Sequence, residues 1–90
     1  MKKIEQTFQE CLEILKKKDA DYCQQGELFS NFKSAQLVGV SPERAVLVRV
    51  MDKLSRISNL IDKEGEVDES LEDSIHDCIN YLAILKELRR

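Results

Sequence analysis

The spacing of apolar residues constrains this chain more than any other feature. In three long segments, apolar side chains recur at steps of three and four residues, which is the period of one face of an α-helix. The predicted buried faces are Ile4, Phe8, Cys11, Leu12 and Leu15, then Val46, Leu47, Val50, Met51, Leu54, Ile57 and Ile61, then Leu71, Ile75, Cys78, Ile79, Leu82 and Leu85. The chain also has only three Gly and one Pro and is rich in Leu, Ile, Lys and Glu, which favour helix, so the sequence predicts an all-α fold.

The expected helix boundaries come from capping signals. The first helix should run from about residue 2 to about residue 22. Ser41-Pro42-Glu43 marks the start of the second helix, with Ser at the N-cap and Pro at the first helical position. This helix should end at about Lys63, before Gly65. The third should begin near Asp68 or Ser70 and end at Leu88.

Three helices with wide apolar faces predict an antiparallel bundle. Phe29 and Phe32 lie in the connection between the first two helices and need burial, so a short helical segment should fold onto the core there. Because three helices bury such faces incompletely, we expect oligomerisation, a homodimer or higher, to complete the bundle.

Composition narrows the functional classes. Ninety residues make one domain, 1–90, and 42% hydrophobic with 34% charged residues is typical of a folded protein. A net charge of −3 argues against a large nucleic-acid footprint. No apolar run approaches the ~18 residues that a transmembrane helix needs, and no signal peptide is evident, so we expect a cytoplasmic protein without a membrane partner. Three cysteines without paired spacing argue against a disulfide framework and a zinc finger.

Two polar stripes carry the chemically capable side chains. Because a short turn joins the second and third helices, one stripe is expected to face the other. They comprise Arg49, Asp52, Lys53 and Arg56 on the second helix, and Asp73, His76, Asp77 and Asn80 on the third. In one interpretation they form interhelical salt bridges, each worth ~0–1 kcal/mol. In the other, the aspartates bind Mg²⁺ while Lys and Arg neutralise phosphates.

Three side chains leave a structural and a functional interpretation open. His76 is either a general base oriented by Asp77 or a surface histidine. Asp73 lies three residues after Ser70, so it can simply cap its helix. Asn31, between two aromatic residues, either holds the loop or contacts a nucleotide base.

Four ordered blocks give the chain a family resemblance. They are residues 18–22, 29–32, 48–60 and 68–73, the last followed by Asp77, Asn80 and Tyr81. Together they resemble the nucleotide-modification-associated domain family of phages and bacteria, which is grouped with the MazG-like all-α NTP pyrophosphatases. The resemblance covers about residues 19–85. It implies an oligomeric helical bundle that binds or hydrolyses nucleoside triphosphates with Mg²⁺.

The resemblance also implies roles for individual residues. The superfamily's metal signature is E-x-x-E on one helix and E-x-x-D on the next, and here Arg49-x-x-Asp52 and Ser74-x-x-Asp77 each keep only the second carboxylate. The expected site has Asp77 as catalytic residue, Asp52, Asp73 and Asp77 as metal ligands, Lys53 and Arg56 on the phosphates, and Asn31, Phe32, Asn80 and Tyr81 on the base or sugar.

Three functions follow as hypotheses. The first is Mg²⁺-dependent hydrolysis of a nucleoside triphosphate to monophosphate and pyrophosphate. The second is nucleotide binding without turnover, as in a phage protein that sequesters a nucleotide. The third is a helical protein-interaction module in which the polar stripes are ion pairs only.

Overall fold

The computed structural model describes residues 2–22, 30–63 and 69–89, and the side chains of 2–18, 32–63 and 71–89. Its elements in chain order are α1 (Lys2–Tyr22), α2 (Ser30–Lys33), the 3₁₀ helix η2 (Ser34–Val38), α3 (Pro42–Leu60) and α4 (Glu69–Leu88). Every regular element in these described ranges is a helix, and the predicted all-α fold is confirmed.

The helix boundaries follow the predicted capping signals closely. The Ser41 hydroxyl accepts a hydrogen bond from the Arg44 backbone N–H over 3.2 Å, and Pro42 occupies the first turn of α3. The last turn of α3 closes where the Ile61 N–H donates to the Ile57 carbonyl over 2.9 Å, so the helix ends slightly before the predicted Lys63. The predicted stop at Gly65 and the Ser70 cap lie outside the described side chains.

A glycine turn connects η2 to α3. Gly39 has φ +79°, a left-handed conformation in which an L side chain is strained. Its N–H donates to the Gln36 carbonyl and the Val40 N–H donates to the Ala35 carbonyl, both over 3.1 Å. The turn ends the 3₁₀ helix and redirects the chain into α3.

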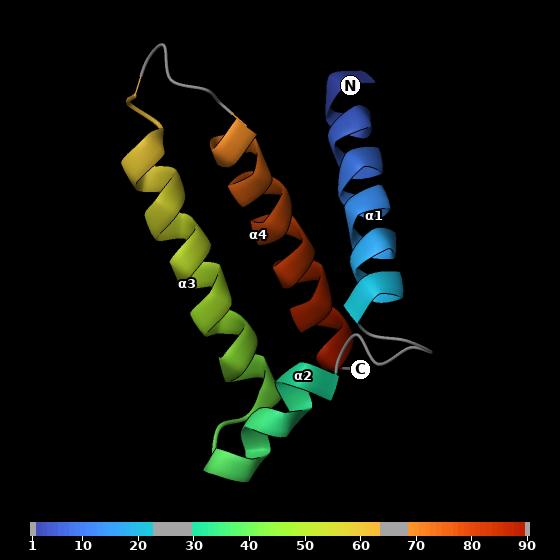
Figure 1. The fold of residues 1–90 in the computed structure, drawn as a ribbon, viewed down its shortest axis with the longest axis vertical. Helices are drawn as coiled ribbons and strands as arrows, with labels where there is room; N and C mark the ends of the chain where they lie inside the picture. The colour runs from blue at the N-terminus through green and yellow to red at the C-terminus, as the bar shows by residue number, and fades with distance from the viewer. Residues whose placement is uncertain (1, 23–29, 64–68, 90) are drawn as a thin grey trace.

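The three long helices are arranged with α4 in the middle (Figure 1). The main helix contacts are those of α4 with α3 and of α4 with α1. α3 and α4 run in opposite directions, and α1 runs in the same direction as α4 (Figure 1). α4 is therefore the element through which both outer helices are held, and a side chain on α4 can reach partners on either side.

The core is small and lies mainly between α3 and α4. Val46, Val50, Cys78 and Ile84 form the buried cluster. The partly buried side chains that pack against it are Leu15, Phe32, Ile57, Tyr81, Leu85 and Leu88. The predicted short segment between α1 and α3 thus does bring Phe32 onto the core. Ile84, which the predicted face of α4 omitted, belongs to it.

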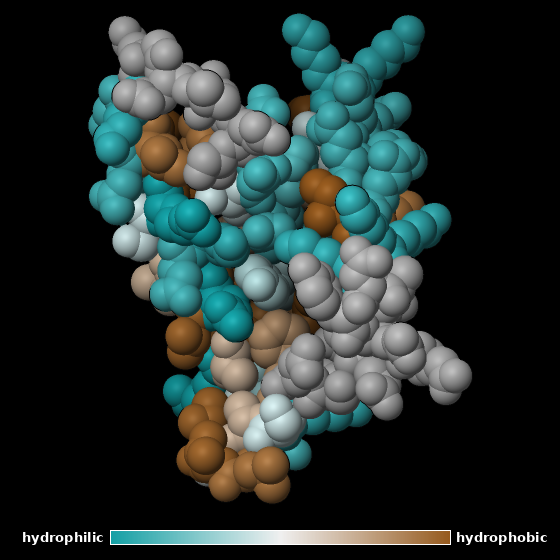
Figure 2. All heavy atoms as spheres, viewed as in Figure 1, coloured by the Kyte–Doolittle hydropathy of each residue, from teal (hydrophilic) through white to brown (hydrophobic). Residues whose placement is uncertain are grey.

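Much of each predicted apolar face remains exposed. The predicted core positions that are exposed are Ile4, Phe8, Leu12, Leu47, Met51, Leu54, Ile61, Ile75 and Leu82. Their burial was predicted wrongly for this single chain, because each face is wider than one or two neighbouring helices can cover. Leu37 and Val38 of η2 are also exposed, and Figure 2 shows apolar surface at that end of the molecule. Oligomerisation stays a prediction.

None of the described helices is both long enough and apolar enough to cross a bilayer.

Candidate functional site

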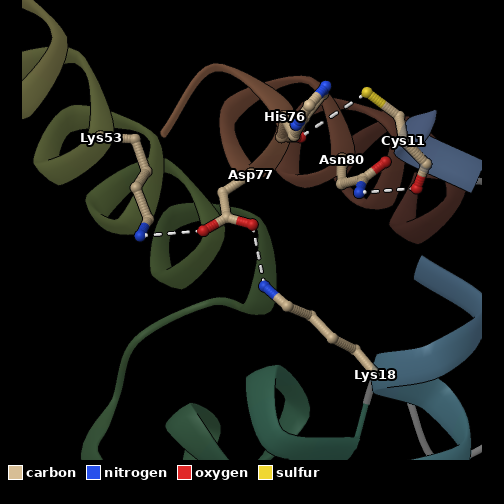
Figure 3. Close-up of polar contacts among 6 residues, drawn as sticks. All are labelled: Cys11, Lys18, Lys53, His76, Asp77 and Asn80. Atoms are coloured by element: carbon tan, nitrogen blue, oxygen red, sulfur yellow. Dashed lines mark hydrogen bonds and ion pairs between the residues drawn. The ribbon is translucent and has the colours of Figure 1, made fainter. Parts of the chain in front are cut away.

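Asp77 on α4 joins all three long helices (Figure 3). Its Oδ1 accepts a hydrogen bond from the Lys18 Nζ of α1 over 2.8 Å. Its Oδ2 pairs with the Lys53 Nζ of α3 over 3.0 Å. One carboxylate therefore binds two ammonium groups, one with each oxygen, at the level where α1, α3 and α4 come together.

The cluster of Lys18, Lys53 and Asp77 is unevenly buried. The side chains of Asp77 and Lys53 are 16% and 17% exposed, whereas that of Lys18 is 42% exposed. Burial by itself raises the pKa of the Asp77 carboxyl, but hydrogen bonds and Coulombic attraction from both lysines outweigh it, and the net pKa lies below its usual value. Asp77 is therefore a carboxylate at neutral pH.

Lys18 was not among the site residues predicted from the sequence. A signal was present, because Lys18 follows Leu15 by three residues and Cys11 by seven. All three therefore lie on the face of α1 that meets α4. Lys53 was predicted, and it follows the buried Val50 by three residues on α3.

Two predicted base-binding residues lie together beside this cluster. Phe32 of α2 and Tyr81 of α4 form an edge-to-face pair with ring centroids 6.1 Å apart and planes at 88°. Tyr81 is one helical turn beyond Asp77, so both side chains project from the same side of α4. Four predicted site residues are thus connected: Lys53 pairs with Asp77, Tyr81 follows Asp77 by one turn, and Phe32 contacts Tyr81.

Asn80 points away from that region, toward α1. Its side chain is buried, and its Nδ2 donates to the Cys11 carbonyl oxygen over 3.0 Å (Figure 3). The Cys11 Sγ in turn lies 4.0 Å from the His76 carbonyl oxygen. In the described chain the Asn80 amide therefore ties α4 to α1, and its predicted contact with a base or sugar stays a prediction.

His76 contacts α1 as well. Its Nε2 lies 3.3 Å from the Glu10 Oε1, while its buried Nδ1 has no hydrogen-bond partner. A shallow pocket of about 190 Å³ opens beside this pair and is lined by Thr7, Glu10, Glu72, Ile75 and His76. His76 and Asp77 are neighbours in sequence, yet they engage different partners on α1.

The predicted magnesium ligands are Asp52, Asp73 and Asp77. Asp52 and Asp73 are exposed, and both oxygens of Asp77 already contact ammonium groups. Among the described residues, no group of three or more His, Cys, Asp or Glu side chains is placed to hold a metal ion. These residues do not present a ready set of ligands, and the Mg²⁺ site stays a prediction of the resemblance.

Two further predicted residues contribute little to the described geometry. The Arg56 side chain is exposed on α3, one turn from Lys53. Asn31 belongs to α2, but its side chain lies outside the described set. Their assigned contacts with phosphate and base stay predictions.

Comparisons with known proteins bear on the family. No family model matches the chain, and neither the curated proteins nor the solved structures include a match to it. The resemblance drawn from the four sequence blocks therefore stays a prediction.

Proposed function

We propose that this chain binds a nucleotide, with Lys18 and Lys53 contacting the phosphates and the Phe32–Tyr81 pair contacting the base. The observation that carries the proposal is the convergence of two ammonium groups, from separate helices, within 3.0 Å of one carboxylate. The resemblance supplies the substrate class, a nucleoside triphosphate.

The spacing of the two lysines suits a phosphate. Each ammonium lies close to a different oxygen of the same carboxylate. A phosphate presents oxygens at comparable spacing and carries more negative charge, and charge-assisted hydrogen bonds to it are stronger than neutral ones. Lysine acts here as a point charge on a flexible stem, so both groups can follow an anion that sits near Asp77.

The aromatic pair supports a role in base recognition. Phe32 and Tyr81 are partly buried and contact each other, and Tyr81 lies one helical turn from Asp77. Stacking of a base on an aromatic ring is worth ~1–3 kcal/mol and tolerates different bases. Phosphate contacts and a stacking surface together form the two halves of a nucleotide site.

Turnover is the second part of the proposal and comes from the resemblance, which implies Mg²⁺-dependent release of monophosphate and pyrophosphate. The described geometry favours binding without turnover as the other candidate, because the Asp77 oxygens are held by lysines.

A thermal-shift series with canonical and modified nucleoside triphosphates, with and without Mg²⁺, tests the proposal. We expect at least one nucleotide to raise the melting temperature, because a ligand that binds only the folded state stabilises it. Lys53→Gln should abolish this shift, while Lys63→Gln, at an exposed position just beyond the end of α3, should retain it. No shift with any nucleotide would favour the structural interpretation, in which the lysines are ion-pair partners only.

Product analysis then separates hydrolysis from binding. The stabilising nucleotide is incubated with protein and Mg²⁺, and the products are resolved by ion-exchange chromatography. Equal amounts of monophosphate and pyrophosphate indicate the enzyme, whereas quantitative recovery of intact nucleotide indicates a binding protein.

A further inference from the structure

We propose that Asp77 is a built-in counter-ion, which occupies Lys18 and Lys53 in the ligand-free chain and which the phosphates of a nucleotide displace. This inference rests on the proposed function and adds a regulatory contact to the same site. In this role the Asp77 carboxylate competes with the ligand, whereas a metal ligand would help to bind it.

The geometry leaves both lysines engaged before any ligand arrives. One carboxylate oxygen lies 2.8 Å from Lys18 and the other 3.0 Å from Lys53. The contacts cross between helices, so they are set by the fold and not by local sequence. An anion can use these ammonium groups only if they leave Asp77 or share it.

The two contacts differ in how readily they can break. Lys53 is 17% exposed and lies between α3 and α4, whereas Lys18 is 42% exposed. A more exposed ion pair is better screened by water and therefore weaker. Lys18 should therefore leave Asp77 for a phosphate first. Lys53 should then leave Asp77 as well, or contact both the carboxylate and the phosphate.

The displacement lowers the apparent affinity for the ligand. When only a fraction of the molecules is in the state that can bind, the apparent affinity is the intrinsic affinity multiplied by that fraction. After displacement, Asp77 also remains as an unpaired carboxylate next to a phosphate, which adds repulsion. Replacing the carboxylate by the isosteric amide should therefore tighten anion binding, by about tenfold if the two ion pairs together contribute about 1.4 kcal/mol.

Calorimetric titration with inorganic tripolyphosphate measures this effect without a base. We compare the unsubstituted chain, Asp77→Asn and Glu72→Gln at one ionic strength. Glu72→Gln is the matched control, because it removes one negative charge from an exposed position on the same helix. We expect Asp77→Asn to bind about tenfold more tightly and Glu72→Gln to match the unsubstituted chain.

Every other outcome of this titration contradicts the counter-ion inference, and one of them also contradicts the proposed function. If the unsubstituted chain binds and Asp77→Asn binds equally or more weakly, the counter-ion inference is overturned while the proposed function stands. Equal tightening by Glu72→Gln would reduce the effect to net charge and also overturn the inference. If neither the unsubstituted chain nor Asp77→Asn binds, the phosphate site itself is wrong and both proposals fall.

A second measurement covers the case in which Asp77→Asn does not fold. The ¹³Cγ resonance of Asp77 in the unsubstituted protein is followed against pH, with and without tripolyphosphate. Loss of the lysines to the ligand should move its titration midpoint upward. An unchanged or lower midpoint in the saturated protein contradicts displacement.

Discussion

The Asn80 amide donates a 3.0 Å hydrogen bond to the backbone carbonyl of Cys11, across the contact between α4 and α1. The side chain is only 9% exposed, so the bond is shielded from water. Together with the Lys18–Asp77 pair one turn away along α4, it is one of the polar contacts that hold α1 against the rest of the chain.

Removing this bond should destabilise the fold. Asn80→Ala leaves the Cys11 carbonyl without its side-chain donor and opens a small void, and we expect a loss of about 1–2 kcal/mol in the free energy of unfolding. Urea denaturation followed by circular dichroism measures it. Asn59→Ala, at an exposed position of α3, is the control and should change stability by less than about 0.5 kcal/mol. Equal effects at both positions would refute a structural role for the amide.

The core predicts a sharper contrast on α3. Val46 is 0% exposed and Val48, two residues on, is 60% exposed. Val46→Ala should cost about 1.5–3 kcal/mol, since two buried methyl groups and their contacts are lost. Val48→Ala should lie within about 0.5 kcal/mol of the original chain. Similar values for the two variants in urea denaturation would contradict the described packing.

The ion pairs of Asp77 predict how stability depends on pH. Because its pKa is lower in the folded chain than in the unfolded one, the stabilisation is present above the unfolded value, about 3.9, and is lost as pH falls through the folded pKa. The difference in unfolding free energy between the original chain and Asp77→Asn should therefore shrink on acidification below pH 4. Denaturation at a series of pH values from 7 downward measures it, and a difference that stays constant would show that Asp77 is not ion-paired in solution.

The exposed apolar residues bear on the predicted oligomer. Phe8 on α1 and Met51 on α3 are 60% and 62% exposed, which is unfavourable for large apolar side chains in water. Sedimentation equilibrium should give a mass above the 10.4 kDa of one chain, and Phe8→Ser should lower it. A single-chain mass for the original protein across micromolar concentrations would contradict oligomerisation.

Local sequence predicted the helices well because their signals are local. The Ser41-Pro42 start was found in the expected role, and α1 has the predicted bounds. Burial was predicted less well, because periodicity identifies an apolar face but not how many neighbours cover it. Leu12 and Cys11 are adjacent on α1, yet only Cys11 meets α4 and is buried.

In the candidate site, too, the features specified by local sequence were predicted, and those that depend on how α1 packs were not. Lys53 and Asp77 were expected to face each other, since a short connection makes α3 and α4 antiparallel, and they form an ion pair. The contribution of Lys18 depends on which side of α4 the first helix occupies, and no local pattern specifies that. Asn80 was assigned to the polar stripe expected to face the second helix, but it is buried and bonded to α1.

The central claim is that Lys18 and Lys53 bind the phosphates of a nucleotide. Isothermal titration of the most stabilising nucleoside triphosphate into the original chain and into Lys18→Gln/Lys53→Gln tests it most directly. Lys16→Gln/Lys63→Gln is the charge-matched control, because it removes one exposed lysine from α1 and one just beyond the end of α3. The claim predicts saturable binding that only the first double variant weakens, by about tenfold or more. Equal affinity in both double variants, or no binding by the original chain, would contradict it.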